Sequence, residues 1–276
     1  MSGRASPTAD GGRVTRFLIA GLVGVYLLFA YSLAINTHHG VGPGGAPPFY
    51  DFGAFYQAGA LADSGNATGA YNDAAMVAAE RSAFPGTTTR LPWNYPPTFL
   101  LPFMPLAALP YVVAWAAWSG LTYGLYVLAV RRLVAPYQLW LMLLAPAAAV
   151  NLFVGQNGTL SVALIAGGVL LLRNRPIVAG MVLGLLAYKP QFAVLAPLVL
   201  LCGREWRALI SAAVSWTALS LLSVVILGVD PWIAFLHKAA APANIFTSSS
   251  SSWLAIPSTM ILARSLGLGP TVSSVL

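Results

Sequence analysis

The sequence predicts an all-α polytopic membrane protein. Hydrophobic residues make up 58% of its 276 residues and charged residues only 8%, whereas a soluble domain carries about 25% charged residues. Apolar runs of about 20 residues recur, and each is long enough to cross roughly 30 Å of hydrocarbon. The alternating strands of about 10 residues that a membrane barrel needs are not visible in the sequence. We therefore expect a bundle of transmembrane helices in a lipid bilayer.

The net charge of +7 indicates topology. Most Arg residues stand in short polar joints between apolar runs, as cytoplasmic loops require. No long basic stripe with interleaved aromatic residues appears, so a nucleic-acid partner is not expected. Residues 1–13 are predicted to be a disordered cytoplasmic tail, ahead of a single transmembrane domain over residues 14–276. The first span is expected at residues 14–35, which is too long for a signal-peptide core and places the N-terminus inside.

Residues 37–97 form the longest hydrophilic stretch and are expected to be a loop outside the membrane. A short helix is predicted over residues 51–62, with Asp51 in the position of an N-cap. Near the end of the loop, Trp93 and Tyr95 are suited to anchor the chain at the membrane interface.

Apolar residues then continue from 98 to 130, about 50 Å as a single helix, which is too long for one crossing. Three prolines divide this run into a short dipping helix over residues 98–108 and a span over residues 110–130. The other spans are expected at residues 136–153, bent at Pro146, at 159–172 and at 207–228, with an outer tail over residues 229–276.

The apolar stretch 176–202 has basic residues before and after it, which places both of its ends in the cytoplasm. These residues are Arg173, Arg175, Arg204 and Arg207. Lys189-Pro190 interrupts the stretch, and each half is about 20 Å of helix, too short to cross alone. A broken helical hairpin with Lys189 at its turn is the favoured solution. The alternative is one long tilted span with a buried lysine and its C-terminal end outside.

Asp51 is the first candidate for chemistry, because it places a carboxylate among aromatic residues near a membrane surface. It is either a helix cap, a role worth about 1 kcal/mol, or a general base. Partial desolvation among aromatic rings raises the pKa of a carboxyl group toward a useful range. The two roles are compatible.

Other polar residues are candidates for binding. A lysine inside an apolar stretch marks a functional site, and Lys189 could hold a phosphate as a point charge, unless it only snorkels toward the interface. Gln156 and Asn157 could hydrogen-bond a sugar, or they could form an ordinary turn. Arg90 is a candidate phosphate contact or a solvated loop residue. No His, Cys and acidic residues have metal-ligand spacing, so neither a metal nor a cofactor is expected.

Four short motifs follow one another along the chain. They are Asp51-Phe52-Gly53-Ala54-Phe55-Tyr56-Gln57-Ala58-Gly59, Asn94-Tyr95-Pro96-Pro97 leading into Pro105-Leu106-Ala107-Ala108-Leu109-Pro110, Gly155-Gln156-Asn157, and Ala179-Gly180-Met181-Val182-Leu183-Gly184-Leu185-Leu186-Ala187-Tyr188-Lys189-Pro190. In this order they resemble glycosyltransferase family 87, bacterial membrane enzymes with the GT-C fold. The resemblance covers about residues 16–265.

The resemblance implies transfer of a hexose, commonly mannose, from a polyprenyl-phosphate donor to a hydroxyl of a glycolipid or glycan, with inversion. Asp51 matches the family's catalytic acidic position, and Lys189 matches its Lys-Pro position. Lys189 and Arg90 would steady the lipid-phosphate leaving group. The candidate sugar- or acceptor-binding residues are Gln156, Asn157, Tyr56 and Tyr95. The resemblance requires no nucleotide site and no metal.

The expected location is the inner (plasma) membrane, with the active site on its outer face. Members of the family usually run longer, with several further spans, so a C-terminal part is expected to be missing. A lipid or glycolipid transporter and a non-catalytic membrane assembly subunit are the alternatives. A transporter would show repeated halves or several charged intramembrane residues, and the sequence shows mainly Lys189.

Overall fold

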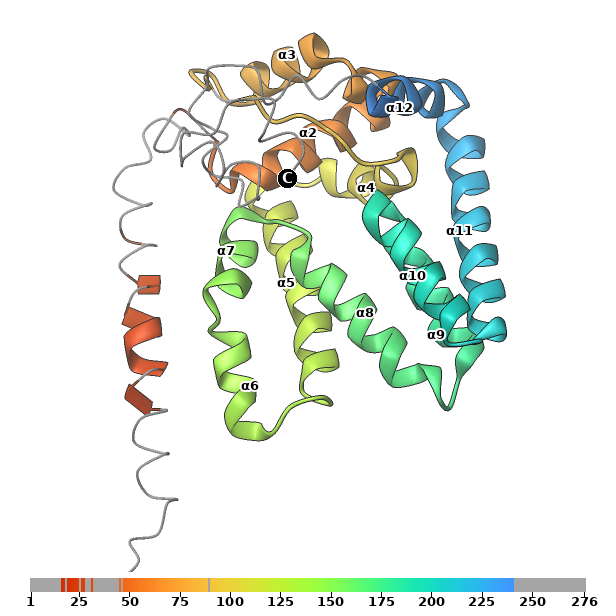
Figure 1. Ribbon diagram of the computed structural model, residues 1–276. Coiled ribbons are helices and arrows are strands. Elements are labelled where there is room, and N and C mark those ends of the chain that lie inside the picture. Colours follow the sequence, from red (N-terminus) through yellow and green to blue (C-terminus); the bar gives the residue numbers. More distant parts are fainter. Residues whose placement is uncertain are drawn as a thin grey trace, which may run out of the picture. The chain divides into compact units, whose positions relative to one another are not determined.

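The computed structural model describes residues 47–88 and 90–240, together with residues 16–17, 19–24, 26–27, 31 and 45. Every regular element among these residues is a helix, which confirms the all-α prediction for the described part of the chain (Figure 1). The chain divides into two units, Met1–Leu236 and His237–Leu276. The fold and the site described below belong to the first unit.

The predicted outer loop folds into a layer of short helices. Its elements are α2 (Tyr50–Asp63), η2 (Ala67–Tyr71) and α3 (Asp73–Ala83), followed by η3 (Pro97–Phe99) and α4 (Phe103–Ala107). The side chain of Asn72 caps α3, because its Oδ1 accepts the Ala75 N–H at 3.0 Å. An amide at this position satisfies one of the free donors of the first helical turn.

A cluster of aromatic side chains forms the core beneath α2. The side chains of Phe52, Trp93 and Phe103 are fully buried, and the rings of Phe55 and Trp93 meet edge to face at 6.0 Å. The prediction that Trp93 anchors the chain at the membrane interface is wrong, because its ring finds its contacts inside this cluster. Edge-to-face aromatic contacts add to the stabilisation that burial already provides. The cluster therefore makes α2 the rigid support for its neighbours.

The remaining helices follow along the chain, and the first unit ends within the last of them. They are α5 (Tyr111–Val130), α6 (Pro136–Leu143), α7 (Pro146–Val154), α8 (Gly158–Leu172), α9 (Pro176–Gly184), η4 (Leu185–Tyr188), α10 (Pro190–Cys202), α11 (Trp206–Leu227) and α12 (Asp230–Ala240). Two of them, α5 and α11, are long and apolar enough to cross a membrane. The start of the predicted outer tail is helical in α12, which the sequence did not predict. Half of the first predicted span, residues 14–35, lies outside the described residues.

Prolines explain where two of the predicted spans are interrupted. The stretch 136–153 was predicted as one bent span, but it forms two helices, because Pro146 has no N–H to continue the first. In the stretch 176–202, Pro190 begins α10, at a position where the missing N–H costs nothing. The short helix η4 follows α9 and ends next to Lys189, which directly precedes α10. The helices α9 and α10 run in opposite directions (Figure 1). Their crossing of a membrane stays a prediction.

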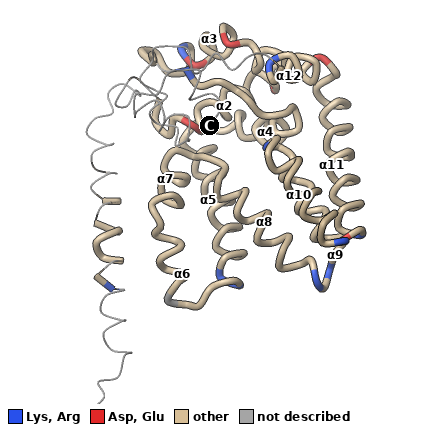
Figure 2. Tube along the Cα trace, viewed as in Figure 1, with Lys and Arg blue, Asp and Glu red and all other residues tan. Residues whose placement is uncertain are grey.

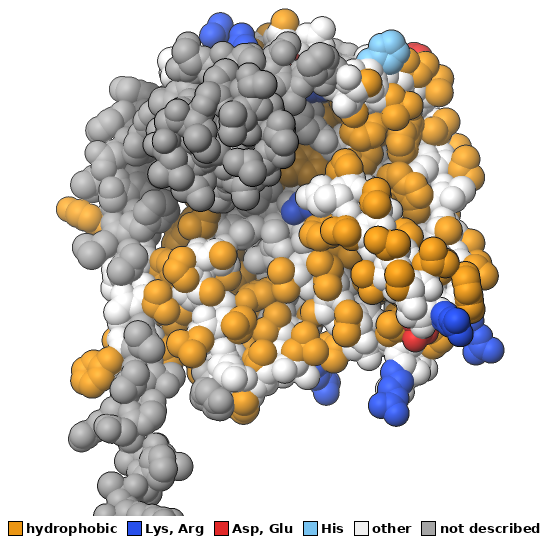
Figure 3. All heavy atoms as spheres, in the orientation of Figure 1, with side chains coloured by type: hydrophobic (Ala, Val, Ile, Leu, Met, Phe, Trp, Pro, Cys, Tyr) orange, Lys and Arg blue, Asp and Glu red, His pale blue; other side chains and the backbone are white. Residues whose placement is uncertain are grey.

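Charge and apolar surface are distributed unevenly over the helices. Figure 2 shows Lys and Arg at the turn after α5, at the α8–α9 turn and at the α10–α11 turn, all at the same end of the helices. Large apolar side chains face outward along α10 and α11, including Val194, Val199 and Val225, and Figure 3 shows one such apolar face. Outward apolar surface that ends in basic turns is the pattern of membrane helices with cytoplasmic loops.

Candidate active site

A cavity of about 270 Å³ lies between α2, the α7–α8 turn, the segment 91–95 and the start of α10. Its polar lining consists of Asp51, Asn94, Tyr95, Gln156, Lys189 and Gln191. Small-molecule sites generally occupy about 300–1,000 Å³, and they combine an apolar wall with a few convergent polar groups. Phe55, Leu91 and Pro92 supply apolar wall here, so the cavity has the composition of a small-ligand site.

Asp51 is not the N-cap of its helix, so the capping interpretation is wrong. Helix α2 begins at Tyr50, so the cap position falls to Phe49. The backbone of Phe49 is left-handed (φ 53°), and its side chain makes no capping hydrogen bond. Asp51 thus stands in the first turn, where its Oδ2 accepts a hydrogen bond from Gln156 Nε2 at 3.0 Å. Burial raises the pKa of the Asp51 carboxyl from 3.8 to about 6, and the Gln156 bond opposes this rise. A carboxylate with this pKa is suited to general base catalysis near neutral pH.

The amide of Gln156 has a defined orientation. Its Oε1 accepts the backbone N–H of Asn157 at 2.9 Å, which turns the opposite side of the amide, the Nε2 donor, toward Asp51. The backbone N–H of Gln156 is bonded in turn to the Asn151 carbonyl at 2.9 Å. Gln156 therefore contacts the carboxylate directly, a role that its position between turn-forming residues did not indicate.

The α7–α8 turn approaches α2 closely enough only because residue 155 is glycine. Gly155 has a φ of 71°, and a Cβ there would lie 2.5 Å from the Cβ of Phe52. Two indoles of α5 hold the turn: Trp118 Nε1 donates to the Gly155 carbonyl at 3.1 Å, and Trp115 Nε1 donates to the Leu152 carbonyl at 3.1 Å. The close approach brings the amide of the turn to the carboxylate of α2.

Lys189 occupies the opposite part of the cavity, at the break between η4 and α10. Its Nζ donates to Ser161 Oγ at 2.9 Å, and Ser161 Oγ lies 2.7 Å from the hydroxyl of Tyr188. Neither Ser161 nor Tyr188 was predicted from the sequence as a site residue. The available signal was their spacing, because Ser161 stands one helical turn after Asn157, and Tyr188 directly precedes Lys189.

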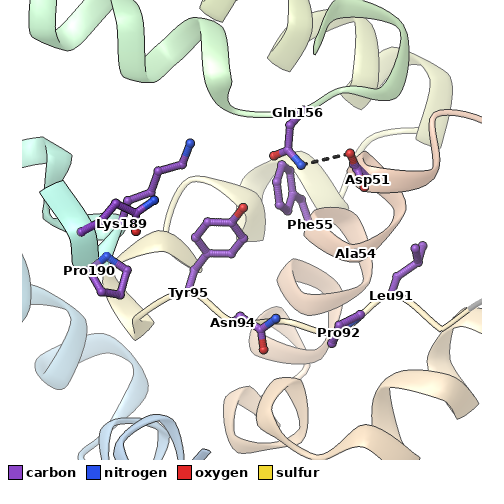
Figure 4. A pocket seen from close by; sticks show the side chains of 11 residues that line it. Asp51, Ala54, Phe55, Leu91, Pro92, Asn94, Tyr95, Gln156, Lys189 and Pro190 are labelled. Atoms are coloured by element: carbon purple, nitrogen blue, oxygen red, sulfur yellow. Dashed lines mark hydrogen bonds between the residues drawn. The ribbon is translucent and has the colours of Figure 1, made fainter. Parts of the chain in front are cut away.

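Figure 4 shows how the four polar groups converge. Asp51 and Lys189 lie on opposite sides of the cavity, and the hydroxyl of Tyr95 and the amide of Gln156 lie between them. Burial raises the pKa of the Tyr95 hydroxyl, which keeps it a hydrogen-bond donor at neutral pH. Within the described ranges each of the two charged groups is hydrogen-bonded to an uncharged side chain. Both charges therefore stay available to a ligand.

Three other predicted site residues do not line the cavity. The Asn157 side chain is fully buried. The Tyr56 hydroxyl donates to the Leu109 carbonyl at 2.8 Å, and Arg90 is an exposed residue next to the lining. In the part of the chain that the structure describes, no three His, Cys, Asp or Glu side chains are grouped as metal ligands would be.

Comparison with known proteins gives one match. The model of glycosyltransferase family 87 matches residues 93–276, which is more than half of the chain. No curated protein and no solved structure matches. The matched range includes Tyr95, Gln156 and Lys189, whereas Asp51 precedes it. The place of Asp51 in the site therefore depends on the geometry described above.

Proposed function

We propose a function from one premise: this chain belongs to glycosyltransferase family 87, whose members are membrane glycosyltransferases. The chain transfers a hexose, mannose in the first instance, from a polyprenyl-phosphate donor to a hydroxyl of a glycolipid or glycan. The observation that carries this proposal is that Asp51 and Lys189, distant in sequence, face one cavity from opposite sides. Single-step displacement at a sugar needs a base and a leaving-group site in such an arrangement.

In the proposed mechanism Asp51 acts as the general base. Its carboxylate takes the proton of the acceptor hydroxyl as the hydroxyl oxygen attacks the anomeric carbon of the sugar. The bond between that carbon and the phosphate oxygen breaks at the same time, and the polyprenyl phosphate leaves with the electron pair. Because attack and departure occur on opposite faces, the configuration inverts. Oδ1 of Asp51 takes the proton in this mechanism, since Oδ2 is the atom bonded to Gln156.

Lys189 stabilises the leaving group in this mechanism. Negative charge develops on the donor phosphate as the sugar departs, and an ammonium group already held in place stabilises that charge. The Tyr95 hydroxyl lies between the two charged groups, and in this mechanism it hydrogen-bonds the sugar. Arg90, Tyr56 and Asn157 carry no step, because the cavity lining does not include them.

The proposed setting is a polytopic bundle of the GT-C type with the cavity on the outer face of the membrane. Two observations support it. The basic turns after α5, α8 and α10 gather at one end of the helices (Figure 2), as cytoplasmic loops do. The cavity is bordered by α2 and by the segment 91–95, which belong to the loop that is predicted to be outside.

The test is transfer of radiolabelled mannose from polyprenyl-phosphate mannose in proteoliposomes. We expect Asp51→Asn to lower the rate by about 10²- to 10⁴-fold, the usual contribution of a general base. Asp63→Asn is the matched control, because Asp63 is an exposed residue at the end of the same helix. Full activity of a correctly inserted Asp51→Asn variant would contradict the mechanism. Movement of the lipid across the bilayer without sugar transfer would instead support a transporter.

A further inference from the structure

We propose that Ser161 and Tyr188 are positioning residues for Lys189. They direct its ammonium group into the cavity and leave its positive charge unneutralised, ready for the phosphate of a polyprenyl-phosphate donor. This inference rests on the proposed function, since it concerns the group that would hold the leaving phosphate. Neither residue belongs to the cavity lining, so each acts through Lys189.

The half-buried side chain of Lys189 and the buried hydroxyls of Ser161 and Tyr188 form a compact network. Ser161 and Tyr188 are both 4% exposed, and their hydroxyl oxygens are 2.7 Å apart. The carbonyl of Asn157 lies 3.1 Å from Ser161 Oγ and 3.2 Å from the Tyr188 hydroxyl. Lys189 Nζ donates to Ser161 Oγ at 2.9 Å.

The number of protons in this network determines which hydroxyl donates each hydrogen bond and which accepts it. The two hydroxyls have one proton each, and the Asn157 carbonyl can only accept. If Ser161 donates to the carbonyl, the Tyr188 hydroxyl donates to Ser161. If Tyr188 donates to the carbonyl, Ser161 donates to Tyr188. In both arrangements a lone pair of Ser161 Oγ is left for an N–H of Lys189, so the ammonium is held at one defined point.

The network holds the charge without cancelling it. The hydrogen-bond partner of Lys189 is an uncharged hydroxyl, and the rings of Tyr188 and Phe192 lie 5.8 and 5.9 Å from its Nζ. Uncharged oxygens and aromatic faces stabilise an ammonium, whereas a carboxylate would pair with it and compete with an anionic ligand. An ammonium has three N–H donors, and Ser161 uses one, which leaves two for a phosphate.

The network is attached to rigid structure on both sides. The Tyr188 ring stacks on Phe99 with centroids 4.3 Å apart and an angle of 9°, and Phe99 belongs to the aromatic core. Ser161 lies in the first turns of α8, and its hydroxyl is tied to the carbonyl of Asn157. A lysine side chain is flexible, so holding it in the bound orientation beforehand reduces the entropy lost when a ligand binds.

The experiment compares binding of polyprenyl monophosphate and of the uncharged polyprenol to the purified full chain in detergent. We expect Ser161→Ala and Tyr188→Phe each to weaken phosphate binding by about three- to tenfold, the range of a net hydrogen bond. Binding of the polyprenol should not change. Ser211→Ala is the matched control, because this buried serine bonds the Ala208 carbonyl within α11. It should bind both lipids as the wild type does.

A double-mutant cycle separates positioning from a general structural role. In the Lys189→Met background, Ser161→Ala should cause no further loss of phosphate binding, because the group that it positions is gone. An undiminished loss in that background overturns the inference. Where Ser161→Ala lowers the melting temperature, Tyr188→Phe provides the same test and keeps the stacked ring.

The failure of this inference differs from failure of the proposed function. Normal phosphate binding by Ser161→Ala and Tyr188→Phe, together with loss of binding in Lys189→Met, overturns the positioning role and leaves the donor site in place. A preference for phosphate over polyprenol that survives Lys189→Met overturns the assigned donor site, and the positioning role with it.

Discussion

At one end of the cavity Asp51 stands on a helix that the aromatic core encloses, whereas at the other end Lys189 occupies a break between two helices. The carboxylate is bonded to an amide from a turn whose Gly155 packs closely against Phe52 of the same helix. The ammonium is bonded to a hydroxyl in a network of side chains. Packing therefore determines the position of one charge, and hydrogen bonding determines the position of the other.

The difference indicates which changes each end tolerates. A closely packed helix does not adjust to a longer side chain or an added methyl group, because protein interiors are dense and transmit strain. A lysine on a flexible stem can move to a new partner at a small cost. We therefore expect the Asp51 end to be sensitive to geometry and the Lys189 end to be sensitive to charge.

Among the variants that compare the two ends, the largest effect is expected from Asp51→Glu, which keeps the charge and lengthens the side chain by one methylene. The rate constant kcat should fall by about 10²-fold, since an error of about 1 Å at the reacting atoms has that cost. Steady-state transfer assays measure this effect. Lys189→Arg is the comparison at the other end, and it should retain most of the activity because it keeps the positive charge. Equal losses in the two variants would remove the distinction between the ends.

A smaller loss is expected from Gly155→Ala. The new Cβ would lie 2.5 Å from the Cβ of Phe52, and the left-handed backbone adds a strain of about 1–3 kcal/mol. The turn should move away from α2, which lowers the melting temperature. The same movement separates the Gln156 amide from the Asp51 carboxylate, so kcat should fall by about tenfold. Gly124→Ala is the control, because nothing lies within 4 Å of its Cβ. Unchanged activity in Gly155→Ala would show that the close approach does not matter.

Gln156→Leu should change the pH dependence of the reaction. Asp51 accepts a proton only when it is ionised, so wild-type activity should fall as the pH drops below the carboxyl pKa of about 6. The Gln156 N–H favours the ionised form, and its removal raises the pKa further. The acidic limb of the rate profile should move upward by about 0.5–1 pH unit. Gln191→Leu, which alters an amide elsewhere in the lining, should leave the limb in place.

The smallest effect on activity is expected from Glu80→Gln in α3. Glu80 is fully buried, its Oε1 accepts the Leu91 N–H at 3.2 Å, and burial raises its pKa from 4.5 to about 7. The folded state thus binds this proton more tightly, so the free energy of unfolding falls as the pH rises from 4.5 to 7.

Glutamine has no such proton, so Glu80→Gln should be more stable than the wild type at pH 8 by about 1–3 kcal/mol. The advantage should disappear at pH 4.5. Melting temperatures at the two pH values measure this difference, and the transfer rate should stay near that of the wild type. A variant less stable than the wild type at pH 8 would mean that the ionised carboxylate stabilises the fold.

The sequence by itself determined the helical class, the family and the breaks in the helices. Apolar runs, basic turns and prolines act over a few residues, so they can be interpreted without knowing what lies across the fold. Lys189-Pro190 is one example: proline cannot continue the preceding helix, and α10 begins at Pro190. The candidate pair of Asp51 and Lys189 also came from local composition, as rare charges in apolar surroundings.

Only the tertiary structure decided which partners these residues meet. Asp51 was predicted to be a helix cap, a general base or both. The cap position falls to Phe49, and the Asp51 carboxylate instead accepts a hydrogen bond from Gln156, in the turn between α7 and α8. Of the neighbours Gln156 and Asn157, one lines the cavity and the other is fully buried. Ser161, whose signal in the sequence was its spacing of four residues from Asn157, proved to be the partner of Lys189. Such contacts join residues far apart in the chain, and they depend on how closely the helices pack, which no local pattern records.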